Sequence, residues 1–181
     1  LQEEFDIPAV EMHLLKHIPT GSGLGGGSSD AAQMLLMLND LFKLNISTAA
    51  LKMLAAKLGS DCPFFIKNKP VFASGRGEVF EEIDLDLSEY EIKVVKSDIH
   101  ISTPEAYGLV KPLEDRPSLR EVIKKPIVEW KDYLINDFEE PIFNKYPEIR
   151  AVKETMYQNG AVYSSMSGSG SAVYGIFALE T

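Results

Sequence analysis

The chain has 181 residues, of which 45% are hydrophobic and 25% are charged, a balance typical of a globular protein with a buried core. Its net charge of -9 argues against nucleic-acid binding, because such proteins present a basic face to the phosphates. The single cysteine, Cys62, excludes an internal disulfide framework and a cysteine-based zinc cluster.

No membrane segment or export signal is predicted. No apolar run reaches the roughly 18 residues that are needed to span a bilayer. Residues 1–7 carry three acids, whereas a signal peptide begins with basic residues followed by an apolar run. We therefore expect a cytoplasmic protein without a membrane partner.

A strand and two helices are predicted in the first third of the chain. Residues 10–18 partly alternate between apolar and polar and lead into a glycine loop, which favours a strand. From Ser28 to Phe42 apolar residues recur every three or four positions, which predicts a helix with capping residues in its first turn. A second helix is expected from Ser47 until Gly59 ends it.

The rest of the chain predicts a mixture of strands and helices. Residues 71–74 and 78–80 are expected to be strands joined by a glycine turn. The acidic stretch 81–89 is the best candidate boundary and suggests two domains, 1–86 and 87–181. Beyond it we expect strands at 90–96 and 172–177 and helices at 104–109, 119–123 and 147–158.

The strongest functional signal is a glycine-rich loop. Residues 19–30 are P-T-G-S-G-L-G-G-G-S-S-D, with five glycines between Gly21 and Gly27. Glycine adopts positive φ and lets a ligand approach the backbone, and the next helix adds unpaired N–H groups and its positive dipole end. A strand, such a loop and a helix N-terminus together favour a phosphate site. The candidate residues are Pro19, Thr20, Gly21, Ser22, Gly23, Leu24, Gly25, Gly26, Gly27, Ser28 and Ser29.

Three other interpretations of this loop are weaker. A flexible linker is not usually followed at once by a capped amphipathic helix. A P-loop requires Gly-Lys-Ser/Thr, but Gly27 is followed by Ser28 and Ser29. The dinucleotide pattern G-x-G-x-x-G occurs at Gly21, Gly23 and Gly26, but no acidic residue ends a clear second strand about 20 residues later.

The loop resembles the ATP-binding motif of the GHMP kinases, which include galactokinase, homoserine kinase, mevalonate kinase and phosphomevalonate kinase. Other segments resemble family segments in the same order, namely 59–65, 102–107, 136–139 and 166–171, with a looser match at 75–78. The resemblance implies an α+β GHMP kinase fold, with a partial S5-like N-terminal lobe and a ferredoxin-like C-terminal lobe. It also implies ATP and Mg²⁺ as cofactors.

Asp61 is the candidate catalytic residue. It lies on a constrained turn between Gly59 and Pro63, with Phe64 and Phe65 expected to pack beneath it. From the sequence alone it can equally be a capping aspartate. The resemblance implies that its carboxylate accepts the proton of an attacking hydroxyl near the γ-phosphate.

Three further residues are implied in substrate binding. Tyr107 can be a core residue, but the resemblance implies that its ring stacks on a cytosine. By composition 167–171 can be a plain hairpin or linker, whereas the resemblance implies a motif that closes against the phosphate loop and includes Gly168 and Ser169. The three histidines show no spacing that suggests a metal site, and Asp137 and Glu139 are expected to serve the fold.

The resemblance implies a small-molecule substrate, 4-diphosphocytidyl-2-C-methyl-D-erythritol, phosphorylated at its 2-hydroxyl for non-mevalonate isoprenoid synthesis. Mevalonate, homoserine or a sugar remain alternatives, as does an ATP-binding module without turnover. The family's N-terminal strand, with a lysine and an asparagine, has no counterpart here. The chain is therefore expected to correspond to the central and C-terminal part of a member, with exposed apolar surface, weak self-association and reduced turnover.

Overall fold

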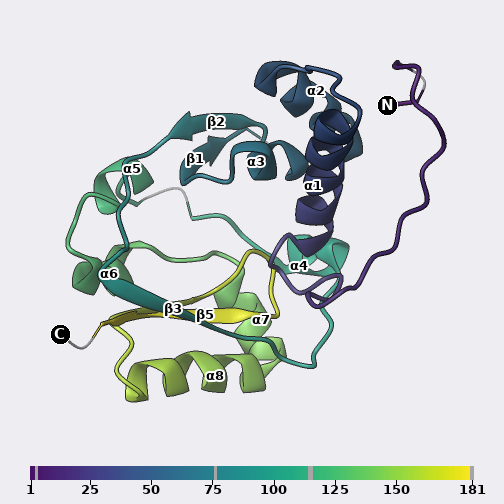
Figure 1. Ribbon diagram of the computed structural model, residues 1–181. Helices are drawn as coiled ribbons and strands as arrows, with labels where there is room; N and C mark the ends of the chain where they lie inside the picture. Colours follow the sequence, from purple (N-terminus) through teal and green to yellow (C-terminus); the bar gives the residue numbers. More distant parts are fainter. Residues whose placement is uncertain (3, 76, 114–115, 180–181) are drawn as a thin grey trace. The chain divides into compact units, whose positions relative to one another are not determined.

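The computed structural model describes residues 1–2, 4–75, 77–113 and 116–179 (Figure 1). The chain forms two compact units, one of Leu1–Thr20 with Gly25–Asp84 and one of Gly21–Leu24 with Leu85–Thr181. The backbone therefore passes from the first unit to the second and back again within the glycine loop.

Three helices pack together in the first unit. They are α1 (Gly26–Leu41), α2 (Thr48–Leu58) and α3 (Cys62–Lys67). The hydroxyl of Ser47 accepts a hydrogen bond from the Ala50 N–H at 3.3 Å and so caps α2. The buried side chains between the helices are Ala32, Leu35, Leu51, Ala55, Cys62 and Ile66. Both predicted helices are confirmed, whereas α3 was not predicted because six residues are too few to show a helical period.

A hairpin completes the first unit. Strands β1 (Val71–Ser74) and β2 (Val79–Glu82) pair antiparallel, with Val71 opposite Glu82 and Ser74 opposite Val79. The glycine turn between them closes with a hydrogen bond from the Gly77 N–H to the Ser74 carbonyl at 3.1 Å. The predicted hairpin is confirmed, and Arg76, which belongs to the loosely matching segment 75–78, lies outside the described residues.

The strand predicted at 10–18 is wrong. This segment has no regular structure, pairs with none of the five described strands, and leaves Leu15 80% exposed. Alternation produces a strand only where a neighbouring strand supplies backbone partners. Here the chain is held by side chains instead, because Lys16 forms an ion pair with Asp30 of α1 and Ile18 lies against Gly26.

The second unit is built on a three-stranded antiparallel sheet. Its strands β3 (Tyr90–Val95), β4 (Tyr163–Met166) and β5 (Val173–Ala178) lie in the order β3-β5-β4. The two faces of β5 pack against different hydrophobic clusters, because successive side chains of a strand point to opposite sides. Val173 joins a cluster with Met166, whereas Ile176 joins another with Trp130. The predicted strands at 90–96 and 172–177 are confirmed, with boundary shifts of one residue.

Short helices surround this sheet. They are α4 (Thr103–Leu109), α5 (Leu119–Val122), the 3₁₀ helix η1 (Ile127–Glu129), α6 (Trp130–Tyr133), α7 (Glu139–Lys145) and α8 (Pro147–Gln158). Helix α8 runs along one face of the sheet, as Figure 1 shows, and contacts β4 and β5. The helices predicted near 104–109, 119–123 and 147–158 are confirmed, and so is the α+β class.

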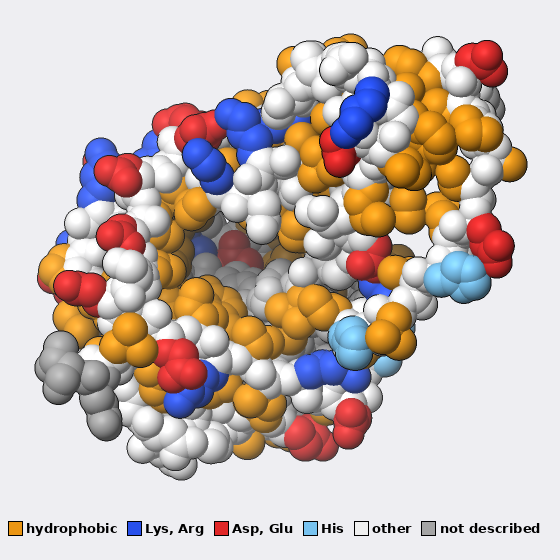
Figure 2. Space-filling view, viewed as in Figure 1, with side chains coloured by type: hydrophobic (Ala, Val, Ile, Leu, Met, Phe, Trp, Pro, Cys, Tyr) orange, Lys and Arg blue, Asp and Glu red, His pale blue; other side chains and the backbone are white. Residues whose placement is uncertain are grey.

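Apolar side chains are exposed on the helices of the first unit. They include Met37 and Leu41 of α1 and Met53 and Leu58 of α2. Figure 2 shows hydrophobic side chains gathered on this part of the surface. The expected exposed apolar surface is therefore present, while weak self-association stays a prediction that sedimentation velocity can test. None of the described helices is both long enough and apolar enough to cross a bilayer.

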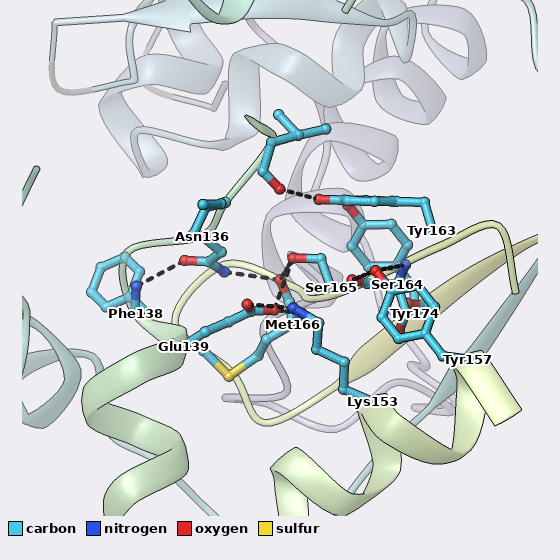
Figure 3. A network of polar contacts seen from close by, with 12 residues as sticks. Asn136, Phe138, Glu139, Lys153, Tyr157, Tyr163, Ser164, Ser165, Met166 and Tyr174 are labelled. Carbon is cyan, nitrogen blue, oxygen red and sulfur yellow. Dashed lines mark hydrogen bonds and ion pairs between the residues drawn. The ribbon is translucent and has the colours of Figure 1, made fainter. Parts of the chain in front are cut away.

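A buried carboxylate joins α7, α8 and β4 (Figure 3). Glu139 is 6% exposed, and one of its oxygens accepts hydrogen bonds from the Met166 N–H at 2.8 Å and the Ser165 hydroxyl at 3.1 Å. Its other oxygen pairs with the Lys153 ammonium at 2.6 Å. The carboxylate is fully engaged within the unit, as expected for a residue that serves the fold.

Changing Glu139 to Gln is expected to lower the free energy of unfolding by about 1–3 kcal/mol, because Lys153 loses its anionic partner and a buried acceptor is weakened. Urea unfolding of the Glu139→Gln variant measures this loss. The matched control is Glu140→Gln, since Glu140 is the exposed neighbour, and its effect is expected within about 0.5 kcal/mol. Equal effects of the two changes would show that the buried network adds nothing.

Candidate active site

In the second unit, part of the glycine loop is seated on the Ser/Gly loop between β4 and β5. The Ser167 hydroxyl donates a hydrogen bond to the Gly23 carbonyl at 2.8 Å. The Ala172 N–H donates to the Ser22 carbonyl at 3.1 Å. These bonds join residues that are far apart in the sequence, and they confirm the expectation that the Ser/Gly loop closes against the phosphate loop.

Glycine is required where the glycine loop contacts the rest of the second unit. Gly23 has a φ of +77°, and a Cβ at this position would overlap the Ser167 carbonyl oxygen and lie 2.7 Å from that of Gly170. Gly21 has a φ of +76°, and a Cβ there would lie 2.6 Å from Cε1 of His100. The glycines therefore serve two purposes, since each adopts positive φ and also permits a close contact.

Ser22 is buried between these glycines with an unused hydroxyl. It is 3% exposed, and its Oγ has no hydrogen-bond partner among the described residues. A buried hydroxyl without a partner costs free energy, so such groups usually belong to a site that a ligand or water completes. The hydroxyl of Ser22 therefore fits a loop that binds an anionic ligand with its polar groups.

In the first unit, the other half of the loop forms the N-terminus of α1. Gly25 is the N-cap residue, with a φ of +64° and no side-chain cap. The first N–H to find an intrahelical acceptor is that of Ser29, which bonds to the Gly25 carbonyl at 2.9 Å. The first turn contains no acid, and the space beside Gly27 is open for 4 Å. Free N–H groups, open space and no carboxylate are the conditions for binding phosphate at a helix N-terminus.

Asp61 occupies the N-cap position of α3 without capping it. Its side chain is exposed and forms no cap hydrogen bond. Its carboxylate contacts the adjacent Ser60 hydroxyl at 3.4 Å. The capping interpretation is therefore wrong, because capping would use the carboxylate that is left available here.

The backbone below Asp61 is firmly held within the first unit. Cys62 and Pro63 are buried, and Phe64 and Phe65 stack edge to face with their ring centroids 4.9 Å apart. The Phe65 ring lies so close to Gly25 that a Cβ there would be 2.8 Å from it. Phe65 thus connects the turn that carries Asp61 to the start of α1, a contact that the sequence did not predict.

Tyr107 presents an exposed ring on α4 of the second unit. It is 65% exposed, and its ring meets that of Phe138 edge to face at a centroid distance of 5.1 Å. The core-packing interpretation is therefore wrong. Helix α4 is anchored by Glu105, whose carboxylate accepts hydrogen bonds from Lys145 and Tyr146, both at 2.7 Å. These hydrogen bonds lower the pKa of Glu105 and keep it ionised.

The family comparisons match both ends of the chain. The GHMP kinases N terminal domain matches residues 1–69, and the GHMP kinases C terminal domain matches residues 116–181. The chain is 50% identical over all 181 residues to a 4-diphosphocytidyl-2-C-methyl-D-erythritol kinase of Parabacteroides distasonis, of which it covers 67%. The chain belongs to the GHMP kinases. A relative of the same name from Azobacteroides pseudotrichonymphae is 53% identical to this GHMP kinase over 178 residues, and the chain covers 67% of that relative as well.

Solved structures agree with this assignment. A crystal structure of 4-(cytidine 5'-diphospho)-2C-methyl-D-erythritol kinase superposes with a TM-score of 0.71 at 36% identity, covering 89% of this chain and 59% of that one. A homoserine kinase from Cytophaga hutchinsonii, with a TM-score of 0.60 at 16% identity, shares the fold alone. The chain spans about two thirds of the length of its curated relatives.

Two residues of this GHMP kinase that hold the glycine loop and the Ser/Gly loop in place were not predicted from the sequence. Ser167 reaches Gly23, and Asn136 donates to the carbonyls of Met166 and Gly168. A serine in a Ser/Gly loop shows no pattern that predicts a partner 144 residues away. Asn136 begins the segment 136–139 that resembles a family segment. The resemblance singled out this segment but did not predict the hydrogen bonds of Asn136. Gly168 is exposed and Ser169 half-buried, and their substrate contacts stay a prediction.

Proposed function

We propose that this chain forms part of a kinase that transfers the γ-phosphoryl group of ATP to the 2-hydroxyl of 4-diphosphocytidyl-2-C-methyl-D-erythritol. The observation that carries the ATP part is the N-terminus of α1 in the first unit, which has no side-chain cap and no acid in its first turn. In the second unit, the buried and unpartnered hydroxyl of Ser22 supports the same proposal. The substrate is supported by the names of relatives about 50% identical to this chain. It is also supported by the exposed ring of Tyr107, which suits stacking on a flat base.

The residues present fit the phosphates of ATP. Residues Thr20 to Ser28 supply backbone N–H donors, and Ser22, Ser28 and Ser29 add hydroxyl groups. Because the first turn of α1 contains no acid, its dipole favours negative charge there. The binding energy comes mainly from backbone groups, so it does not depend on the negative net charge of the chain.

Mg²⁺ fits this loop as an ion held chiefly by the phosphates. The described residues contain no cluster of three or more His, Cys, Asp or Glu suited to a metal. The hydroxyls of Ser28 and Ser29 in the loop are protein donors that could reach the ion. Such sparse protein ligation is usual for Mg²⁺ at nucleotide sites. When bound, the ion offsets phosphate charge that builds up in the transition state.

The proposed chemistry uses Asp61 as the base. Its carboxylate takes the proton from the attacking 2-hydroxyl as the new bond forms between that oxygen and the γ-phosphorus. The bond from the γ-phosphorus to the bridging oxygen breaks, and ADP leaves with the electron pair. The loop N–H groups hold the phosphates in position, so most of the rate enhancement comes from orientation and charge stabilisation.

The test is ADP release by the chain with ATP and Mg²⁺, comparing the diphosphocytidyl substrate with mevalonate, homoserine and galactose. Turnover that requires the diphosphocytidyl substrate supports the proposal. Turnover with another alcohol instead would assign a different GHMP kinase reaction. Saturable ATP binding without any product would support a binding module that lacks turnover.

Changing Ser22 to Ala is expected to have opposite effects on stability and on ATP binding. Without ATP the variant should be as stable as the wild type or about 1 kcal/mol more stable, because an unsatisfied buried hydroxyl is removed. Its KM for ATP should rise about 5- to 10-fold, since one hydrogen bond to phosphate is worth about 1–1.5 kcal/mol. Thermal unfolding and steady-state kinetics measure the two effects.

The control for this prediction is Ser118→Ala. Ser118 is exposed at the N-cap of α5 and makes no side-chain cap hydrogen bond. Neither stability nor the KM for ATP should change. A Ser22→Ala variant that binds ATP as well as the wild type would remove Ser22 from the proposed site.

A further inference from the structure

Asn136 uses its whole side-chain amide to hold two separate segments of the second unit. Its Nδ2 donates to the Met166 carbonyl at 2.9 Å and to the Gly168 carbonyl at 2.8 Å. Its Oδ1 accepts from the Phe138 N–H at 3.0 Å. Figure 3 shows the side chain between Phe138 and Met166. Both N–H donors and the amide oxygen are thus engaged at once.

One of these two segments leads directly to the glycine loop. Met166 and Gly168 flank Ser167, whose hydroxyl donates to the Gly23 carbonyl at 2.8 Å. The carbonyls on both sides of Ser167 are therefore held by the same amide. Because a Cβ on Gly23 would overlap the Ser167 carbonyl oxygen, the two backbones are in close contact, and the position of this short stretch helps to determine where Ser22 and Gly23 lie.

The other segment leads to the exposed aromatic ring. Phe138 meets Tyr107 edge to face at a centroid distance of 5.1 Å, and its backbone N–H donates to the Asn136 amide oxygen. The hydrogen bond from the Phe138 N–H to the Asn136 amide oxygen closes a tight turn at the start of α7 and so fixes the point from which the Phe138 ring projects. Phe138 supports the Tyr107 ring, and most of the surface of Tyr107 is open to solvent.

We propose that Asn136 is a positioning residue that fixes the Ser22–Gly23 part of the phosphate loop and the Tyr107–Phe138 pair relative to each other. The inference rests on the proposed function, which assigns phosphate binding to the loop and base stacking to Tyr107. The amide of Asn136 is engaged by backbone groups, so the residue acts through Ser167 on one side and Phe138 on the other. An amide is suited to this task because it offers two donors and an acceptor in one plane.

The Asn136→Asp variant isolates this role. Aspartate has the same shape and still accepts from Phe138, but its carboxylate faces two carbonyl oxygens that formerly received hydrogen bonds. Those oxygens disfavour the charged form and so raise the pKa of the introduced carboxyl group. As the pH falls the group becomes protonated and regains one donor. The matched control is Asn159→Asp, because Asn159 is an exposed residue at the C-cap of α8.

Amide hydrogen exchange tests the proposal without any ligand. The Ala172 N–H bonds to the Ser22 carbonyl at 3.1 Å and reports the contact between the loops, whereas the Val162 N–H bonds to the Ile176 carbonyl at 2.8 Å and reports the sheet. Asn136→Asp should speed exchange at Ala172 at least about 10-fold and leave Val162 unchanged. Asn159→Asp should change neither. Equal acceleration at both amides, or none at Ala172, would overturn the proposal.

Turnover provides the second measurement. With ATP and the diphosphocytidyl substrate, Asn136→Asp should lower kcat/KM for both substrates about 10- to 100-fold at about pH 8, because small displacements of binding groups are costly. The ratio of variant to wild-type activity should rise between about pH 8 and pH 6, while that of Asn159→Asp stays constant. A constant ratio for Asn136→Asp would contradict the proposal.

The two proposals can fail separately. If the wild-type chain gives no ADP with the diphosphocytidyl substrate, the proposed reaction fails. Hydrogen exchange at Ala172 then still decides whether Asn136 positions the loops.

Discussion

The Asp61→Asn variant is expected to lose turnover by about 10²- to 10⁴-fold while it folds and binds ATP normally. Asparagine cannot accept the proton of the attacking hydroxyl, so the loss should appear in kcat and not in the KM for ATP. The fold should be unaffected, because the carboxylate is exposed and forms no cap hydrogen bond to α3. Steady-state kinetics and thermal unfolding of the same preparation measure both effects.

Asp40→Asn is the control for charge removal in the same unit. Asp40 is exposed on α1 and pairs with Lys43, three residues later, at 2.9 Å. Such a surface pair contributes about 0–1 kcal/mol, so neither kcat nor the Tm should change much. If Asp61→Asn kept most of the wild-type kcat, the base would have to be another residue.

The Gly23→Ala variant is expected to abolish ATP-dependent turnover, with a loss of at least about 10²-fold. The added methyl group would overlap the Ser167 carbonyl oxygen and approach that of Gly170 to 2.7 Å, so the two loops must move apart. Positive φ adds a backbone penalty of about 1–2 kcal/mol. We expect the Tm to fall and ATP binding, measured by calorimetry, to weaken strongly.

Gly160→Ala separates backbone strain from steric overlap. Gly160 follows α8 with a φ of +92°, and no atom lies within 4 Å of the point that an added Cβ would occupy. The free energy of unfolding of this variant should therefore fall only by the conformational penalty of about 1–2 kcal/mol, and the variant should bind ATP as the wild type does. If both variants bound ATP equally well, the contact between Gly23 and the Ser/Gly loop would be irrelevant to the site.

Much of the fold was predictable because it depends on local patterns. The apolar period from Ser28 to Phe42 and the cap at Ser47 predicted α1 and α2, since helix signals lie within a few residues of one another. The strand expected at 10–18 failed because a strand depends on a partner that alternation does not reveal. Strand β4 was not predicted for a similar reason, because its buried serines obscure the apolar pattern.

The candidate site was predictable in its parts but not in its connections. The glycine run and Asp61 stood out because unusual backbone and a constrained turn have local signatures. The bonds from Ser167 to Gly23 and from Asn136 to Gly168 have none, because they depend on how distant segments meet. The boundary expected after residue 86 likewise did not anticipate that Gly21–Leu24 would belong to the second unit.

The hydrogen bond between Ser167 and Gly23 spans 144 residues and has a consequence for the order of folding. Closing so long a stretch of chain costs entropy that local contacts do not incur, so this bond should form late in folding. During synthesis the ribosome makes residues 21–24 early, and they must wait for β4 and the loop that follows it. A nascent chain that ends before Ser167 should therefore contain a formed α1 but none of the residues of the Ser/Gly loop that contact Gly23. Nucleotide binding should appear only after β5 leaves the exit tunnel.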